Sequence, residues 1–271
     1  RAFYISQYAN AYGQINNSYD HLFDGKVTQL YSSISDTLKR FLELTESISF
    51  TDHAHFNNPV DDLPKHSFSD PKQHVDLIEF YRELDSHFMP NSLAFEDVCI
   101  AYRERQAILK NPNKHVRYYS SNHGSAMGGA FGIAVGAAIA NPLSKVFLFS
   151  GDGCFRLYGG SLAEARHLNI TLFIMNNLEL SIIHDGCNHI INDDETFHYH
   201  EFIEPIDWVS LAQGFGWRAL TLKPDLSNLS DIMAMSYDKL STSILVNVPI
   251  DCAQVIGKNF RYESLQPFPN L

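Results

Sequence analysis

Positive charge is scarce in this sequence: 20 lysines and arginines stand against 31 aspartates and glutamates, which gives a net charge of −11 at pH 7. No cluster of Lys and Arg reverses this balance locally. Because binding to nucleic acid or to an anionic membrane depends on a basic surface, the composition argues against both kinds of partner. We expect a small molecule or another protein instead.

Cysteines are also few. Cys99, Cys154, Cys187 and Cys252 lack the CxxC spacing of metal sites, and a chain of 271 residues that is 45% hydrophobic can build a core without disulfides. The sequence therefore predicts a reduced, cytoplasmic protein.

Long hydrophobic runs and a signal peptide are likewise missing. The longest apolar run, residues 125–140, is rich in glycine and is shorter than the roughly 20 residues needed to cross a bilayer. It predicts a buried element and not a membrane span. The chain begins with Arg1 and shows no signal-peptide pattern, so we expect a fragment or a processed subunit of a longer protein.

What the sequence does contain, from residue 71 onward, is a regular alternation of helical and strand patterns. The expected strands are short, rich in Val, Ile, Leu and Phe, and without alternation of polar and apolar residues, which is typical of strands buried on both faces. This pattern predicts an α/β fold with a doubly wound, mostly parallel sheet and helices on both faces. The expected strands lie near residues 93–99, 145–150, 171–175, 217–221 and 244–248, and the expected helices near 73–88, 126–140, 162–168, 208–215 and 226–240.

The N-terminal part reads differently. Residues 26–44 place apolar side chains at helical spacing and predict one amphipathic helix of about five turns. Residues 51–71 are polar and punctuated by proline, with no period, which indicates a linker between domains.

Two polar motifs follow neighbouring strands of the predicted sheet. Gly151-Asp152-Gly153 comes directly after the strand at 145–150, and Asn176-Asn177 ends the strand at 171–175. In such sheets ligands bind beyond the carboxyl ends of the strands, and a carboxylate beside a carboxamide suits a hard cation such as Mg²⁺. Either motif alone is also common as a plain turn or strand end. Between them, Ser161 and Glu164 have the spacing of a capping box, which predicts the start of a helix.

The pair of motifs resembles the thiamine-diphosphate motif of the acetolactate-synthase and pyruvate-decarboxylase superfamily. The resemblance extends over residues 76–255, including SNHGSAMGGAFGIAVGAAIANP at 121–142 and DWVSLAQGFGW at 207–217. Residues 1–50 are similar to the end of the central Rossmann-like domain of that family. The resemblance thus implies a linker at 51–75 and a diphosphate-binding domain at 76–271.

The resemblance implies a Mg²⁺ ion held by side-chain oxygens of Asp152 and Asn177 and by the backbone carbonyl of Glu179. The spacing from Asp152 to Asn177 is slightly short for the family, so Asn176 is a possible substitute for Asn177.

For thiamine diphosphate itself, the resemblance implies backbone N–H groups of Gly153 and Cys154 at the diphosphate, with Gly151 allowing a close backbone approach. Met127 would prop the cofactor into its bent shape, and the backbone carbonyl of Ser125 would accept a hydrogen bond from the aminopyrimidine. Cys99 stands where the family has the glycine of a D-V-G turn, which leads us to expect a changed site on that side.

The glutamate that activates the cofactor in this family belongs to a pyrimidine-binding domain, and nothing in residues 1–75 resembles one. We therefore expect another chain or another segment to supply it, within a dimer or a heterotetramer.

The segment after the metal motif bears on the reaction. Ile183 stands where decarboxylase relatives have a catalytic glutamate, the Ile182-Ile183 pair is similar to a Met-Val pair of acetolactate synthases, and Gly186 replaces their tryptophan. This favours a 2-oxo acid substrate, with decarboxylation followed by carboligation or acyl transfer. A simple decarboxylase subunit and a non-catalytic cofactor-binding or regulatory subunit are the alternatives.

Histidines and glycines leave two further questions open. His184, His189, His198 and His200 could be loop residues, and within them the stretch HDGCNH could form a zinc site of His184, Cys187 and His189. His184 could also transfer protons beside the cofactor. Glycines at every fourth position from 124 to 136 permit a close helix contact, either within the subunit or with another one.

Overall fold

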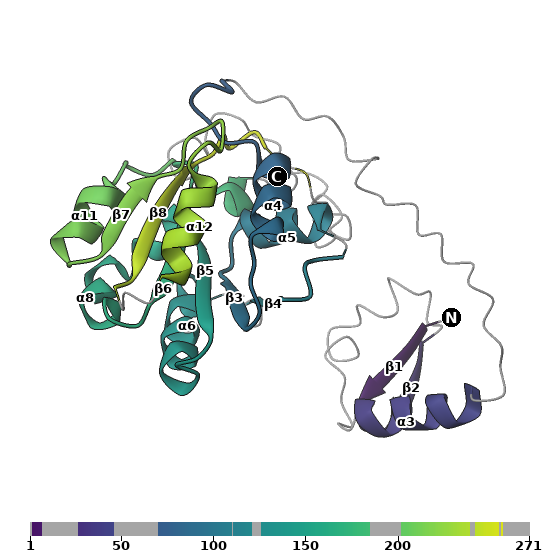
Figure 1. Ribbon diagram of the computed structural model, residues 1–271. Helices are drawn as coiled ribbons and strands as arrows, with labels where there is room; N and C mark the ends of the chain where they lie inside the picture. The colour runs from purple at the N-terminus through teal and green to yellow at the C-terminus, as the bar shows by residue number, and fades with distance from the viewer. Residues whose placement is uncertain are drawn as a thin grey trace, which may run out of the picture. The chain divides into compact units, whose positions relative to one another are not determined.

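The computed structural model describes residues 2–6, 27–45, 70–109, 111–120, 126–184, 202–238, 242–254 and 256 (Figure 1). The chain divides into two compact units, formed mainly by Arg1–Asn57 and by Asn58–Asn259. Of the predicted linker at 51–75, only residues 70–75 are described. There Val75 belongs to the second unit: its side chain is fully buried and its N–H donates to the Pro249 carbonyl at 2.8 Å.

The first unit corrects the helix expected at 26–44. Its first part is a strand, β2 (Val27–Tyr31), which pairs in parallel with β1 (Ala2–Ser6). The helix, α3 (Ile34–Thr45), begins only after Ser33, whose Oγ accepts from the Asp36 N–H at 3.0 Å and donates to the Asp36 carboxylate at 2.7 Å. The cap at Ser33 therefore fixes where the helix begins, and apolar spacing alone does not reveal such a boundary.

The second unit contains a parallel six-stranded sheet in the order β4-β3-β5-β6-β8-β7. This confirms the predicted fold class. The strands are β3 (Ser92–Glu96), β4 (Val116–Ser120), β5 (Lys145–Gly151), β6 (Ile170–Asn176), β7 (Arg218–Thr221) and β8 (Ile244–Pro249). All residues of β5 are buried, as expected of a central strand covered on both faces.

Helices cover both faces of this sheet (Figure 1). On one face, α4 (Leu77–Ser86), α5 (Ile100–Ile108) and α12 (Leu229–Tyr237) contribute to a core with Phe147 and Phe149 of β5. On the other, α6 (Gly129–Ala140), α8 (Leu162–Ala165) and α11 (Trp208–Gly214) contribute to a core with Val146 and Leu148. Alternate residues of one strand thus serve opposite cores.

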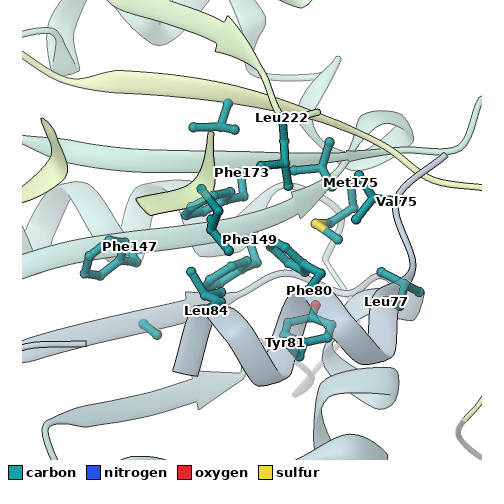
Figure 2. Packing of buried hydrophobic residues seen from close by; sticks show 14 of the residues in the cluster. Val75, Leu77, Phe80, Tyr81, Leu84, Phe147, Phe149, Phe173, Met175 and Leu222 are labelled. Carbon is teal, nitrogen blue, oxygen red and sulfur yellow. The ribbon is translucent and has the colours of Figure 1, made fainter. Parts of the chain in front are cut away.

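Aromatic side chains fill much of the first core (Figure 2). Phe149 stacks on Phe173 with ring centroids 5.1 Å apart, and Phe80 of α4 meets Phe173 edge-on at 5.9 Å. Such contacts add to the hydrophobic energy of burying large rings. They hold α4 against the middle of the sheet and leave the carboxyl ends of the strands to the loops.

The expected capping box at Ser161 is wrong, although α8 does begin at Leu162. Ser161 makes no side-chain capping bond, and its backbone lies at φ −89° and ψ 5°, away from the extended conformation of a capping residue. A 3₁₀ turn, Gly159–Ser161, leads directly into α8, so the chain is already helical before Leu162.

None of the helices in the described residues is long and apolar enough to span a membrane. Within the described part of the chain, Cys99, Cys154 and Cys252 form no disulfide, and Cys187 lies outside it.

Lys145 is buried at the start of β5. Its Nζ donates to the Asn169 carbonyl at 2.6 Å and to Asn169 Oδ1 at 2.9 Å. Burial, helped by the positive charge of Arg218, lowers the pKa of Lys145 to about 7.

This pKa predicts a pH dependence of stability. Unfolded Lys145 keeps its proton up to a pH of about 10.4, so between about pH 7 and pH 10 the unfolded state binds more protons and stability rises with pH. One proton corresponds to a slope of at most about 1.4 kcal/mol per pH unit. We expect urea denaturation to show this rise in wild type and to show less of it in Lys145→Met; equal slopes in the two proteins would contradict the assignment.

Candidate functional site

The site expected from the sequence lies where β5 and β6 end. Gly151 of β5 is paired with Met175 of β6, so the two strands finish side by side. Asp152 follows β5 as the first residue of the short helix α7 (Asp152–Phe155), and Asn177 follows β6. The fold thus brings together two residues that are 25 positions apart in the sequence.

Asp152 links the two strand ends. Its carboxylate is buried and accepts hydrogen bonds from the Leu178 N–H and the Gly153 N–H, both at 2.9 Å. Burial nevertheless raises the pKa of Asp152 to about 6, because these neutral donors only partly offset the loss of solvent. A cation at this carboxylate would restore the favourable interaction that burial removes.

The two asparagines make different contacts. Asn177 donates from Nδ2 to Ser181 Oγ at 2.5 Å, and its Oδ1 accepts from the Glu179 N–H at 3.3 Å. Asn176 instead donates from Nδ2 to Asn247 Oδ1 of β8 at 3.0 Å. Asn176 is thus tied to the neighbouring strand, whereas Asn177 belongs to the loop that Asp152 holds.

Glu179 has a buried side chain that the sequence reasoning overlooked. Its Oε2 accepts from Ser181 Oγ at 2.7 Å, and its Oε1 lies 3.3 Å from His184 Nδ1. The His184 ring is about one-third exposed, at 34%. The role proposed for Glu179 concerned its backbone, and nothing in the local pattern marks the side chain as a partner of His184.

Asp97 is a second buried carboxylate at this edge of the sheet, directly after β3. Its Oδ1 accepts from the Gly128 N–H at 3.0 Å and the Val98 N–H at 2.9 Å, and its Oδ2 accepts from Ser150 Oγ at 2.7 Å. Burial raises the pKa of Asp97, while these bonds lower it. Asp97 thereby joins the ends of β3 and β5 to the turn before α6. Two features of the sequence point to Asp97: it is an acid at the end of a buried strand, and it is the first residue of the segment that resembles the D-V-G turn of the family.

Cys99 does not strain the backbone in place of glycine. Its φ of −144° and ψ of 168° are extended, a conformation open to any residue. The small residue that matters here is Gly151, because a Cβ at Gly151 would lie 3.1 Å from Cys99 Cβ. The thiol of Cys154 donates to the Val98 carbonyl at 3.0 Å, and burial raises its pKa to about 12, so it acts as a structural group.

Gly128 and Met127 lie beside these loops. Gly128 has a φ of 78°, and a Cβ there would overlap the Tyr158 ring. Met127 is half-buried against the core that includes Cys154. A Cβ at Gly132 or Gly136 would meet open space, so this part of the glycine face packs against no other helix among the described residues.

Several predicted site residues lie outside the described part of the chain: Ser125, Gly124, Gly186, Cys187, His189, His198 and His200. Within the described part, no group of three or more His, Cys, Asp or Glu residues is placed to hold a metal ion. A cation at Asp152 would therefore depend on amide, carbonyl and ligand oxygens for the rest of its coordination.

Leu178 supports a prediction about strain at this loop. Its φ of 57° is left-handed, which costs a residue with a side chain roughly 1–2 kcal/mol and costs glycine little. We expect Leu178→Gly to have a higher free energy of unfolding than Leu178→Ala by about 1 kcal/mol, measured by denaturant unfolding without ligand. Leu178→Ala is the matched control because it removes the same side chain and keeps the strain; a less stable glycine variant would contradict the assignment.

Comparison with known proteins places these features in a family. The family model described as "Thiamine pyrophosphate enzyme, C-terminal TPP binding domain" matches residues 105–248. The chain is also 25% identical over 247 residues to the acetolactate synthase isozyme 1 large subunit of Escherichia coli (strain K12), an alignment that covers 86% of this chain and 42% of that protein.

A solved structure with a similar fold is the thiamine diphosphate-dependent 4-hydroxybenzoylformate decarboxylase of Rhodococcus jostii RHA1. It matches with a TM-score of 0.67 at 17% identity, covering 93% of this chain and 44% of that one. The chain thus spans less than half the length of both relatives. Because the family model covers more than half of the chain, including Asp152 and Asn177, the chain belongs to the thiamine pyrophosphate enzymes and carries their C-terminal TPP-binding domain.

Proposed function

We propose that residues 76–271 form a diphosphate-binding domain that holds thiamine diphosphate through Mg²⁺ at the carboxyl ends of β5 and β6. In this proposal residues 1–50 are the end of a central Rossmann-like domain. The linker lies within residues 51–75 and ends before Val75, which is buried in the second unit. The observation that carries the proposal is the bond from the Leu178 N–H to the Asp152 carboxylate at 2.9 Å, because it keeps the acid beside Asn177.

The residues present fit a hard cation. Asp152 offers a buried carboxylate, Asn177 a carboxamide oxygen, and Glu179 a backbone carbonyl. Mg²⁺ in proteins is usually held by one or two carboxylates, with water and the phosphates of a ligand completing its shell. One carboxylate with few other protein ligands agrees with that preference.

We assign the cofactor contacts to the neighbouring loops. Backbone N–H groups of Gly153 and Cys154 would face the diphosphate, and Gly151 would keep the strand end free of a side chain. Met127, before Gly128, would support the cofactor from its half-buried position, and the carbonyl of Ser125 would bind the aminopyrimidine. When bound, thiamine diphosphate supplies carbanion chemistry, while the protein supplies binding and orientation.

For the reaction we propose decarboxylation of a 2-oxo acid followed by carboligation or acyl transfer. Ile183 at the position of the decarboxylase glutamate supports this, and so does the relative named as an acetolactate synthase. The neighbour named as a decarboxylase favours the alternative, a simple 2-oxo acid decarboxylase. His184, held at Glu179, is the candidate for proton transfer.

The activating glutamate would come from a pyrimidine-binding domain on another chain or segment, in a cytoplasmic dimer or heterotetramer. This chain covers 42% of the length of the acetolactate synthase relative, which supports the proposal that another chain or segment supplies this domain. The alternative from a different class is a non-catalytic cofactor-binding or regulatory subunit that keeps the fold.

Calorimetric titration of thiamine diphosphate into the chain, with Mg²⁺ and with EDTA, tests the proposed function. We expect wild type to bind thiamine diphosphate only in the presence of Mg²⁺. Asp152→Asn should bind it at least about tenfold more weakly, because losing a metal ligand should cost at least as much as losing a residue that supports one. The control is Asp231→Asn, an exposed carboxylate in the first turn of α12. Equal affinity of wild type with and without Mg²⁺ would contradict the proposal.

A further inference from the structure

Asn177 is connected to Glu179 through the hydroxyl of Ser181. Asn177 Nδ2 donates to Ser181 Oγ at 2.5 Å, and Ser181 Oγ donates to Glu179 Oε2 at 2.7 Å. Ser181 and Glu179 are both 7% exposed, so little solvent reaches this short relay.

The carboxylate of Glu179 determines which atom donates in each of these two hydrogen bonds. A carboxylate accepts hydrogen bonds and donates none, and a serine hydroxyl has one hydrogen. The hydrogen of Ser181 is therefore committed to Glu179, and the hydroxyl can only accept from Asn177. The atom of Asn177 that faces Ser181 must then be the NH₂ group, which turns Oδ1 away from Ser181.

Glu179 is itself held from other directions. Its Oε1 lies 3.3 Å from His184 Nδ1, and the thiol of Cys252 lies near the same carboxylate. The carboxylate therefore has neighbours that fix its position, which makes it a firm acceptor for Ser181.

We propose that Ser181 and Glu179 are positioning residues that fix the carboxamide of Asn177 with its oxygen, and not its nitrogen, available to a divalent cation. The two ends of a carboxamide have nearly the same shape, so packing alone distinguishes them poorly. Mg²⁺ takes oxygen ligands, and an inverted Asn177 offers it an NH₂ group. The inference rests on the proposed function, since it assumes that Asn177 Oδ1 binds the cation.

Two variants of equal shape test the inference: Ser181→Thr keeps a hydroxyl, and Ser181→Val replaces it with a methyl group. The measurement is the affinity of the full chain for Mn²⁺ with saturating thiamine diphosphate, followed by the electron paramagnetic resonance of free Mn²⁺. We expect Ser181→Val to bind Mn²⁺ at least about tenfold more weakly than Ser181→Thr, the usual effect of removing a partner of a metal ligand. Thermal unfolding without ligands should separate the two variants much less than the metal affinity does.

Glu179→Gln is the second variant, which also serves if Ser181→Val does not fold. A glutamine can donate to Ser181, which frees the serine hydrogen for Asn177 and permits the inverted carboxamide. We expect its affinity for Mn²⁺ to fall below that of Ser181→Thr.

The outcomes separate the two proposals. Equal Mn²⁺ affinity in Ser181→Thr, Ser181→Val and Glu179→Gln, with wild type binding normally, overturns the positioning role and leaves the proposed function standing. Wild type that binds thiamine diphosphate without any effect of the cation overturns the proposed function, and the inference with it.

Discussion

The buried carboxylate of Asp97 is the contact on which this edge of the sheet depends. It accepts from Val98, from Gly128 and from the hydroxyl of Ser150, so it ties together the loop after β3, the turn before α6 and the end of β5. A buried charge without such partners costs several kcal/mol. These three segments therefore cannot move apart without exposing donors and an acceptor at once. Asp152 extends the same principle to the loop after β6 through Leu178.

Asp97 and Asp152 have different roles: Asp97 holds loops together, and Asp152 is the candidate ligand of a cation. Asp97 accepts three hydrogen bonds, one of them from the Ser150 hydroxyl, whereas Asp152 accepts one on each oxygen, both from backbone N–H groups. Burial raises the pKa of Asp152 to about 6. Leu178, whose backbone is left-handed, lies between the candidate ligands Asn177 and Glu179. Strained residues of this kind are common at functional sites.

Much of the fold could be predicted from the sequence, because short, continuous apolar runs such as 145–150 and 171–175 are typical of strands buried on both faces. The family and the parallel sheet are confirmed. The strand at Val27–Tyr31 was missed because its apolar residues continue the spacing of the helix behind it. Asp97 and Ser150 are bonded to each other across 53 positions of the sequence, a contact that no local pattern reveals. The roles of Ser181 and Glu179 depend on which atom donates the hydrogen bond, which the sequence does not reveal either.

The most direct test of the account is a crystal structure of the chain grown with thiamine diphosphate and Mg²⁺. The account predicts a cation about 2.1 Å from an oxygen of Asp152 and from Asn177 Oδ1, with the diphosphate bound to it. A diphosphate bound elsewhere on the chain, or a cation that touches neither residue, would contradict it.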